Sequence, residues 1–171
     1  IVILGAGAAG LMCAITAAKR NKSILVLEKS NKVGKKILMS GGGRCNFTNL
    51  FVEAEHFISK NPHFCKAALK RYTPEDFISM VEKHQIDYEE KNHHQLFCIN
   101  SSKDILNMLL VECEEAGVEI LTDTEVESTE NLTIEESHIR YQLETVSGFN
   151  KSIVQCKSLI VATGALSIPT L

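Results

Sequence analysis

The chain has 171 residues, of which 44% are hydrophobic and 23% charged, and its formal net charge is −3. This length predicts one domain, or one domain with part of another, and the apolar content excludes a disordered chain. The slightly acidic balance does not indicate nucleic acid as a partner and argues against a membrane-surface helix, unless charge is locally segregated.

The six cysteines are scattered, and no two have the C-x-x-C spacing of a metal site. The chain is also too long and too apolar to resemble a small disulfide-bonded scaffold. We therefore predict free thiols, a cytoplasmic location and no metal. The uncharged stretch 1–18 could imitate a signal sequence or a membrane span, but it contains three glycines and its Lys19-Arg20 pair follows the stretch. We predict neither.

The first thirty residues predict a strand, a helix and a second strand. Residues 1–4 are an apolar run that ends at Gly5, which is typical of a buried parallel strand. Residues 8–20 predict a helix with Leu11 and Ile15 on one face, and residues 24–27 predict another buried strand. The chain thus opens with a β–α–β unit.

The middle of the chain, residues 51–116, predicts a mainly helical insertion. Helices are expected over 62–72 with Asn61 as N-cap, from Thr73 with Pro74 in its first turn, and from Ser101 to a stop at Gly117.

The last third predicts strands. Buried strands are expected at 118–121 and 159–161, and between them an antiparallel strand over 137–146 turns back at 147–150 into a strand over 153–156. Together these elements predict an α/β fold: a doubly wound, mostly parallel, Rossmann-like sheet with a β-meander and a ligand at the carboxyl ends of its strands.

The first strand and helix are joined by Gly5-Ala6-Gly7-Ala8-Ala9-Gly10, a G-x-G-x-x-G sequence, and Glu28 ends the next strand. In this context Gly5 permits the tight turn, Gly7 admits a diphosphate to the backbone, and Gly10 lets the helix approach the strand. The N–H groups at the start of the helix favour an anion, and Glu28 would accept hydrogen bonds from a ribose. The alternative is a glycine-rich turn without a ligand.

A second glycine-rich stretch is locally basic, since no acidic residue lies between Glu28 and Glu53. The cations there are Lys29, Lys32, Lys35, Lys36 and Arg44, and three consecutive glycines follow at Gly41, Gly42 and Gly43. An anionic ligand explains both features, whereas a solvated loop explains only the lysines.

Ala162-Thr163-Gly164 follows the last buried strand. A strand that ends in this way after a β-meander is typical of flavoproteins with two dinucleotide-binding folds, in which FAD lies along the first fold.

Residues 33–49, V-G-K-K-I-L-M-S-G-G-G-R-C-N-F-T-N, resemble the characteristic segment of the BaiN/YhiN family of FAD-dependent oxidoreductases. Gly5–Gly10, Leu96-Phe97 and residues 162–167 also resemble that family, although Ala165 stands where it more often has glycine. The resemblance implies that residues 1–171 are an FAD-binding domain. Members of this family continue past the position that corresponds to Leu171. The resemblance therefore also implies that the C-terminal part of the domain is missing, and it leaves open whether the 171 residues are active alone.

The resemblance further implies which residues bind FAD. Its phosphates, ribityl chain and ring would lie near these residues: Gly5, Gly7, Ala8, Ala9, Gly10, Glu28, Lys29, Lys35, Lys36, Ser40, Gly41, Gly42, Gly43, Arg44, Cys45, Asn46, Ala162, Thr163 and Gly164. The backbone near Val126 would hold the adenine. No catalytic residue can be assigned.

The implied activity is transfer of a hydride from a nicotinamide donor, NAD(P)H, through FAD to an organic substrate. Substrates of the family include unsaturated steroid-like acids, small amines and the pyrimidine ring of uracil in RNA, and nothing in this sequence chooses among them or indicates an oligomeric state. Two alternatives remain open: an NAD-dependent Rossmann dehydrogenase, and a dinucleotide-binding module without catalysis.

Two further features have simpler interpretations. Cys45 is expected to pack or to contact the flavin ring rather than to form a redox dithiol, because position 50 is Leu50. His93-His94 is expected to lie in a solvated loop, because no carboxylate has an obvious helical spacing to it.

Overall fold

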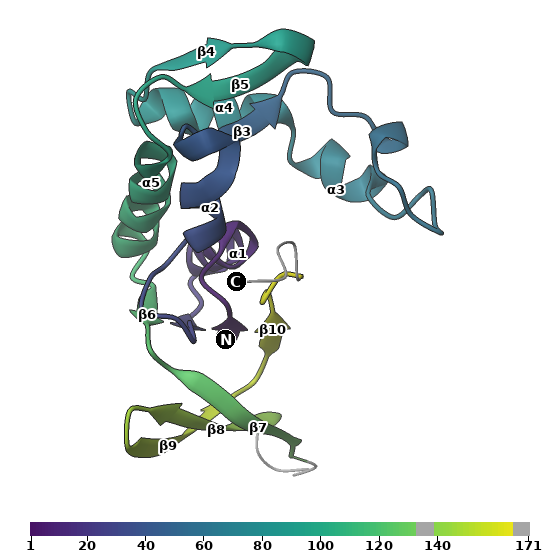
Figure 1. Ribbon diagram of the computed structural model, residues 1–171. Helices are drawn as coiled ribbons and strands as arrows, with labels where there is room; N and C mark the ends of the chain where they lie inside the picture. The colour runs from purple at the N-terminus through teal and green to yellow at the C-terminus, as the bar shows by residue number, and fades with distance from the viewer. Residues whose placement is uncertain (133–138, 166–171) are drawn as a thin grey trace. The chain divides into compact units, whose positions relative to one another are not determined.

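The computed structural model describes residues 1–132 and 139–165 (Figure 1). The chain divides into two compact units, one formed by residues 1–36 with the chain from residue 109 on, and one formed by residues 37–108.

The first unit is built on a four-stranded parallel sheet with the order β10-β1-β2-β6. The strands are β1 (Val2–Leu4), β2 (Leu25–Leu27), β6 (Glu119–Leu121) and β10 (Leu159–Val161). Val2 is in register with Leu25 on one side and with Leu159 on the other. The predicted parallel Rossmann-like sheet is confirmed. The central strands are well buried, whereas Leu121 and Val161 on the outer strands β6 and β10 are exposed.

Helix α1 (Ala8–Ala18) connects β1 to β2 and buries Leu11, Ala14 and Ile15. These positions recur at three and four residues, so one apolar stripe of the helix is removed from water. The helix begins at Ala8, and Gly7 is its N-cap, directly after the turn that follows β1.

A three-stranded antiparallel meander, β7-β8-β9, completes the first unit. It consists of β7 (Glu125–Asn131), β8 (Tyr141–Ser147) and β9 (Asn150–Cys156). Leu143 and Cys156 of the meander form one buried cluster with Val2 and Leu27 of the parallel sheet. The meander is confirmed, but sequence patterning missed β7, whose polar residues do not alternate with apolar ones. The start of the strand predicted over 137–146 lies outside the described residues.

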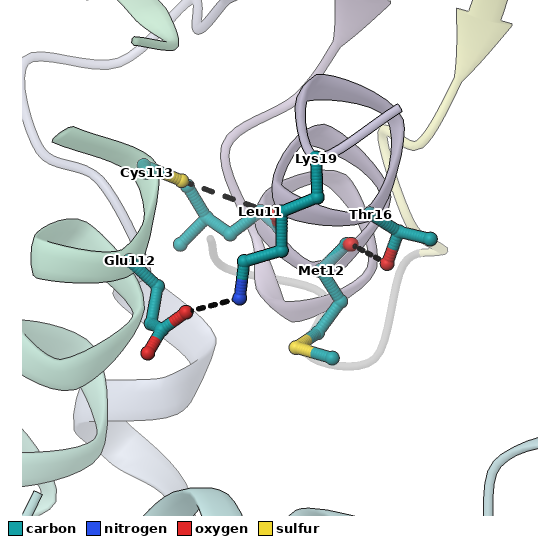
Figure 2. Close-up of polar contacts among 6 residues, drawn as sticks. All are labelled: Leu11, Met12, Thr16, Lys19, Glu112 and Cys113. Carbon is teal, nitrogen blue, oxygen red and sulfur yellow. Dashed lines mark hydrogen bonds and ion pairs between the residues drawn. The ribbon is translucent and has the colours of Figure 1, made fainter. Parts of the chain in front are cut away.

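Helix α5 (Ser102–Glu115) ends in the first unit, where its last turns contact α1 (Figure 2). The side chain of Glu112 is 1% exposed, and one of its carboxylate oxygens lies 2.5 Å from Lys19 Nζ. The Cys113 thiol donates to the Leu11 carbonyl at 3.9 Å. These contacts join α1 to a segment roughly a hundred residues away in sequence.

The second unit contains a three-stranded antiparallel sheet, β3-β5-β4, as well as helices. Its elements are α2 (Lys35–Met39, which begins at the boundary), η1 (Ser40–Gly43), β3 (Asn46–Asn49), η2 (Ala54–His56), α3 (Lys66–Arg71), α4 (Pro74–Lys83), β4 (Tyr88–Glu90), η3 (Asn92–His94), β5 (Gln95–Cys98) and the start of α5. The ring of Phe47 on β3 packs against Phe77 and Tyr88, with ring centroids 5.9 and 5.6 Å away.

Helix α3 begins later than the sequence predicts. The Asn61 side chain accepts a hydrogen bond from the backbone N–H of His63 at 3.0 Å, and this local turn competes with helix formation. The helix therefore begins only after Cys65. The predicted start of α4 is confirmed, because Thr73 and Asp76 form a capping box with Pro74 in the first turn.

Candidate cofactor-binding site

The turn between β1 and α1 requires glycine at two positions for packing. Gly5 has φ +101°, and a Cβ there would lie 2.6 Å from the carbonyl oxygen of Ala162. A Cβ at Gly10 would overlap the carbonyl oxygen of Gly5. These two glycines allow α1 to approach the sheet, which explains them without a ligand.

Gly7 has no such explanation. Its φ of −85° is available to any residue, and a Cβ built on it would meet nothing within 4 Å. The same residue caps the N-terminus of α1, where no side chain accepts from the first N–H groups, those of Ala8, Ala9 and Gly10. An open space beside unsatisfied N–H groups is where a diphosphate binds to a Rossmann domain. The turn therefore fits a dinucleotide.

Glu28 follows β2 at the carboxyl edge of the sheet and is half-buried. One of its carboxylate oxygens accepts from the N–H of Ala6 at 2.8 Å, and the other accepts from the N–H of Ser30 at 2.9 Å. Each oxygen keeps further acceptor capacity, which could serve ribose hydroxyls. Glu28 thus also has a structural role, since it ties the glycine turn to the end of β2. No sequence pattern predicts that the backbone N–H of Ala6 donates to Glu28.

The predicted basic residues of the first unit have different surroundings. Lys36 donates to the carbonyl oxygen of Ala165, and its ammonium nitrogen is 3.5 Å from where a Cβ on Gly164 would lie. Lys35 is exposed. Lys29 pairs with Glu125 at 2.6 Å, so part of its charge is already neutralised by the protein.

The loop after β10 and the start of β7 also belong to the first unit. Ala162 packs against the glycine turn, and Gly164 has φ +75°, which favours glycine. Val126 packs against the buried cluster around Leu143 and pairs with Thr145 of β8. Residues 166–167, which also resemble the family, lie outside the described residues.

The second unit contains the predicted residues Ser40–Asn46. All three glycines have positive φ, but a Cβ at Gly41 would lie 2.7 Å from the Phe97 ring, whereas Gly42 and Gly43 have open space around them. Arg44 pairs with Glu89 at 3.1 Å. The structure therefore gathers Gly5–Gly10, Glu28, Lys36 and residues 162–164 within the first unit, and Ser40–Asn46 within the second.

Cys45 is 5% exposed and has φ +50°, an uncommon conformation for a residue other than glycine. Burial raises the pKa of its thiol, although a hydrogen bond with Ser40 acts in the opposite direction. Burial, together with the neighbouring Cys45, raises the pKa of Cys98 to about 12. Both thiols are therefore protonated at neutral pH, which favours a packing role over thiolate chemistry.

His93 and His94 are exposed, as expected for a solvated loop, but His94 does have a carboxylate partner at a spacing of four residues. Its Nδ1 lies 2.7 Å from an oxygen of Glu90, four residues earlier, and both side chains are about half exposed. His93 and His94, at the end of η3, both have φ values of 59°, which is uncommon for residues other than glycine. An exposed pair of this kind is a surface contact and is not assigned to catalysis.

Within residues 1–132 and 139–165, no group of three or more His, Cys, Asp or Glu side chains is arranged to hold a metal ion. No helix in the same part of the chain has the length and apolar character needed to cross a membrane.

A parallel sheet with an unhindered glycine at the N-terminus of its first helix, and a carboxylate at the end of its second strand, defines a Rossmann-type dinucleotide-binding domain. The chain belongs to the family described as HI0933-like protein Rossmann domain, whose model matches residues 1–171. The resemblance inferred from the sequence is confirmed.

Similar proteins of known name include a ribosomal RNA dihydrouridine synthase from Haemophilus influenzae, which is 50% identical over 170 residues. That alignment covers 99% of this chain and 41% of the relative, so the chain spans about two fifths of its length. A 3-dehydro-bile acid delta(4,6)-reductase from Clostridium scindens is 28% identical, over 75% of this chain and 32% of the reductase.

Among solved structures, a 3-ketosteroid-delta4-(5alpha)-dehydrogenase from Rhodococcus jostii matches with a TM-score of 0.67 and 14% identity, over 96% of this chain and 45% of that one. At this identity the match shows the fold alone. Family and fold together confirm the predicted class of a Rossmann-type dinucleotide-binding domain.

Proposed function

We propose that this chain holds FAD in a cytoplasmic enzyme that reduces uracil rings of ribosomal RNA with hydride from NADH or NADPH. Gly7 is the observation that carries the cofactor assignment: glycine stands at an uncapped helix N-terminus where neither packing nor backbone conformation requires it. The substrate class is supported by the 50% identical relative, which is named for forming dihydrouridine in ribosomal RNA.

Dihydrouridine carries two more hydrogens than uridine, one on each carbon of the C5–C6 bond. Its formation therefore needs a hydride and a proton. Bound FAD would relay the hydride from the nicotinamide donor to the uracil ring. We assign no proton donor to this chain.

The chain's own residues would bind and orient the cofactor. The N–H groups of Ala8, Ala9 and Gly10 would donate to the diphosphate, with Gly7 providing the space. Glu28, held by two backbone N–H groups, would accept from the ribose of the adenosine end without having to become ordered first. Lys35 and Lys36 would add positive charge, and Gly42 and Gly43 would let backbone approach the cofactor closely.

The domain organisation follows the same proposal: residues 1–171 belong to an FAD-binding domain, and residues 51–116 form an insertion in it. The negative net charge does not oppose an RNA substrate, because net charge does not report how charge is distributed over the surface. A steroid-like substrate is the second candidate, supported by the bile acid reductase at 28% identity.

The test is a reaction of the purified full-length protein with transcribed, unmodified ribosomal RNA and either NADH or NADPH. We expect a yellow protein with bound FAD, and dihydrouridine in nuclease digests analysed by mass spectrometry. The Gly7→Val variant is the matched control, and we expect it to lose FAD and activity together. An FAD-loaded protein that leaves ribosomal RNA unchanged but reduces an unsaturated 3-keto bile acid would reject the RNA assignment and favour the second candidate.

A further inference from the structure

The segment 56–72 of the second unit exposes large apolar side chains without a covering element among the described residues. Phe57 is 45% exposed, Ile58 105% and Phe64 78%. In Figure 1 this part of the chain, which includes α3, extends away from the three-stranded sheet of the same unit. Exposed aromatic groups in one contiguous segment indicate a binding surface.

The same segment concentrates positive charge. Between Glu55 and Glu75 the chain carries the cations Lys60, Lys66, Lys70 and Arg71 and no carboxylate. All four side chains are exposed, and none forms an ion pair with any residue that the structure describes. Although the net charge of the chain is −3, its cations are locally concentrated in segment 56–72.

Helix α3 is fixed from one side, which leaves its cations directed to solvent. Cys65 is buried, and its thiol donates to the Ala54 carbonyl at 3.8 Å, while Leu69, one turn later, is half-buried. Lys66 and Lys70 are likewise one turn apart and lie on the neighbouring, exposed face. The segment thus combines an anchored backbone with outward cations and rings.

Alternating cations and aromatic groups suit a polyanion whose units carry flat rings. Phosphates neutralise lysine and arginine, and unpaired bases stack on phenylalanine and tyrosine. A protein cover fits less well, because the cores of protein interfaces are depleted in lysine and burying four unneutralised cations is costly. We propose that segment 56–72 is a surface that binds single-stranded regions of the RNA substrate, an inference that rests on the proposed function but names a site outside the FAD-binding residues.

The test measures RNA binding by the full-length FAD-loaded protein. The probe is a fluorescein-labelled single-stranded RNA of twenty nucleotides and mixed sequence, followed by fluorescence anisotropy at several KCl concentrations. One variant combines Lys66→Glu, Lys70→Glu and Arg71→Glu, and its matched control combines Lys22→Glu, Lys103→Glu and Lys157→Glu, three exposed cations elsewhere with the same change in net charge. A second pair compares Phe64→Ala with Phe149→Ala, since Phe149 is 105% exposed in the turn between β8 and β9.

We expect the segment triple variant to bind the RNA at least tenfold more weakly, and the slope of log Kd against log salt to fall by about 2, because each phosphate contact on a single strand contributes about 0.7. The control triple should change Kd less than threefold. Phe64→Ala should weaken binding several-fold, with an unchanged salt slope, because it removes stacking and not charge. Bound FAD should stay the same in all variants.

Three results would overturn the proposal: a wild-type protein that does not bind the probe, a segment triple variant that binds like its control, or a triple variant that loses thermal stability while RNA binding is unchanged, which would mean that protein covers the segment. Wild-type RNA binding that is lost in the triple variant, without dihydrouridine formation by either protein, would support this surface and reject the proposed reaction. The two proposals can therefore fail separately.

Discussion

Alanine at Gly7 and alanine at Gly10 should separate the two roles of glycine in the turn between β1 and α1. At Gly7 the added methyl group meets no protein atom within 4 Å, and φ is already −85°. Folding stability should therefore change by less than about 1 kcal/mol, since the loss of chain flexibility and the weaker N-cap are small opposing effects. The methyl group would instead stand in the space that a diphosphate needs, and we expect FAD to bind roughly 10–100-fold more weakly, or about 1.4–2.8 kcal/mol.

At Gly10 the added methyl group should lower the folding stability itself. The methyl group would overlap the carbonyl oxygen of Gly5 and lie 3.1 Å from the carbonyl carbon, and these backbone atoms cannot rotate away as a flexible side chain can. Moving α1 away from the sheet would cost about 3 kcal/mol or more, at the upper end of the range for overpacked cores. The apoprotein itself should be destabilised.

The two variants are compared by denaturant unfolding of the apoprotein and by FAD titration followed through flavin fluorescence. Gly7→Ala should match wild type in unfolding and differ in FAD affinity, whereas Gly10→Ala should already differ in unfolding. If Gly7→Ala binds FAD as wild type does, the open space at Gly7 is not the diphosphate site, and the reasoning from the glycine turn is refuted.

Three further predictions concern single side chains. Glu28→Gln should weaken FAD binding and also lower stability by about 1 kcal/mol, because an amide nitrogen cannot accept the N–H bonds that both carboxylate oxygens accept; unchanged unfolding would show that the turn does not depend on the carboxylate. Lys19→Met should lower the free energy of unfolding by about 1–2 kcal/mol, because it leaves the buried carboxylate of Glu112 without its cation. The loss should be smaller than for a fully buried ion pair, because Lys19 is 53% exposed. Lys22→Met is the control, and equal unfolding midpoints for the two variants would contradict the prediction. Burial raises the pKa of Cys113 from 9.0 to about 11, so the folded state favours the protonated thiol. The stability that the protonated Cys113 thiol contributes is present below pH 9 and is lost as the pH rises toward about 11, at about 1.4 kcal/mol for each unit by which the pKa is raised. The stability of Cys113→Ala should therefore fall less steeply over this pH range than that of wild type. Identical stability profiles of the two proteins over this range would refute the raised pKa of Cys113.

The β1–α1–β2 unit, the capping box of α4 and the strands of the parallel sheet could be predicted from sequence because each depends on neighbouring residues. Apolar runs, helical periodicity and the G-x-G-x-x-G turn act over a few positions, and the parallel sheet then follows from the short list of ways such units connect. Much of the candidate site was accessible for the same reason, since Gly5, Gly7, Gly10 and Glu28 stand where a dinucleotide-binding unit places them.

Other features were decided only by tertiary structure. Glu28 accepts from the Ala6 N–H, Gly41 is required by the ring of Phe97, and Lys36 reaches the Ala165 carbonyl, although these partners are far apart in the chain. The sheet β3-β5-β4 was missed because its short strands carry no clear alternation and are stabilised by pairing with distant segments. Local patterns record the preferences of a backbone segment, whereas the partner of a buried or charged side chain depends on which distant segment the fold brings next to it.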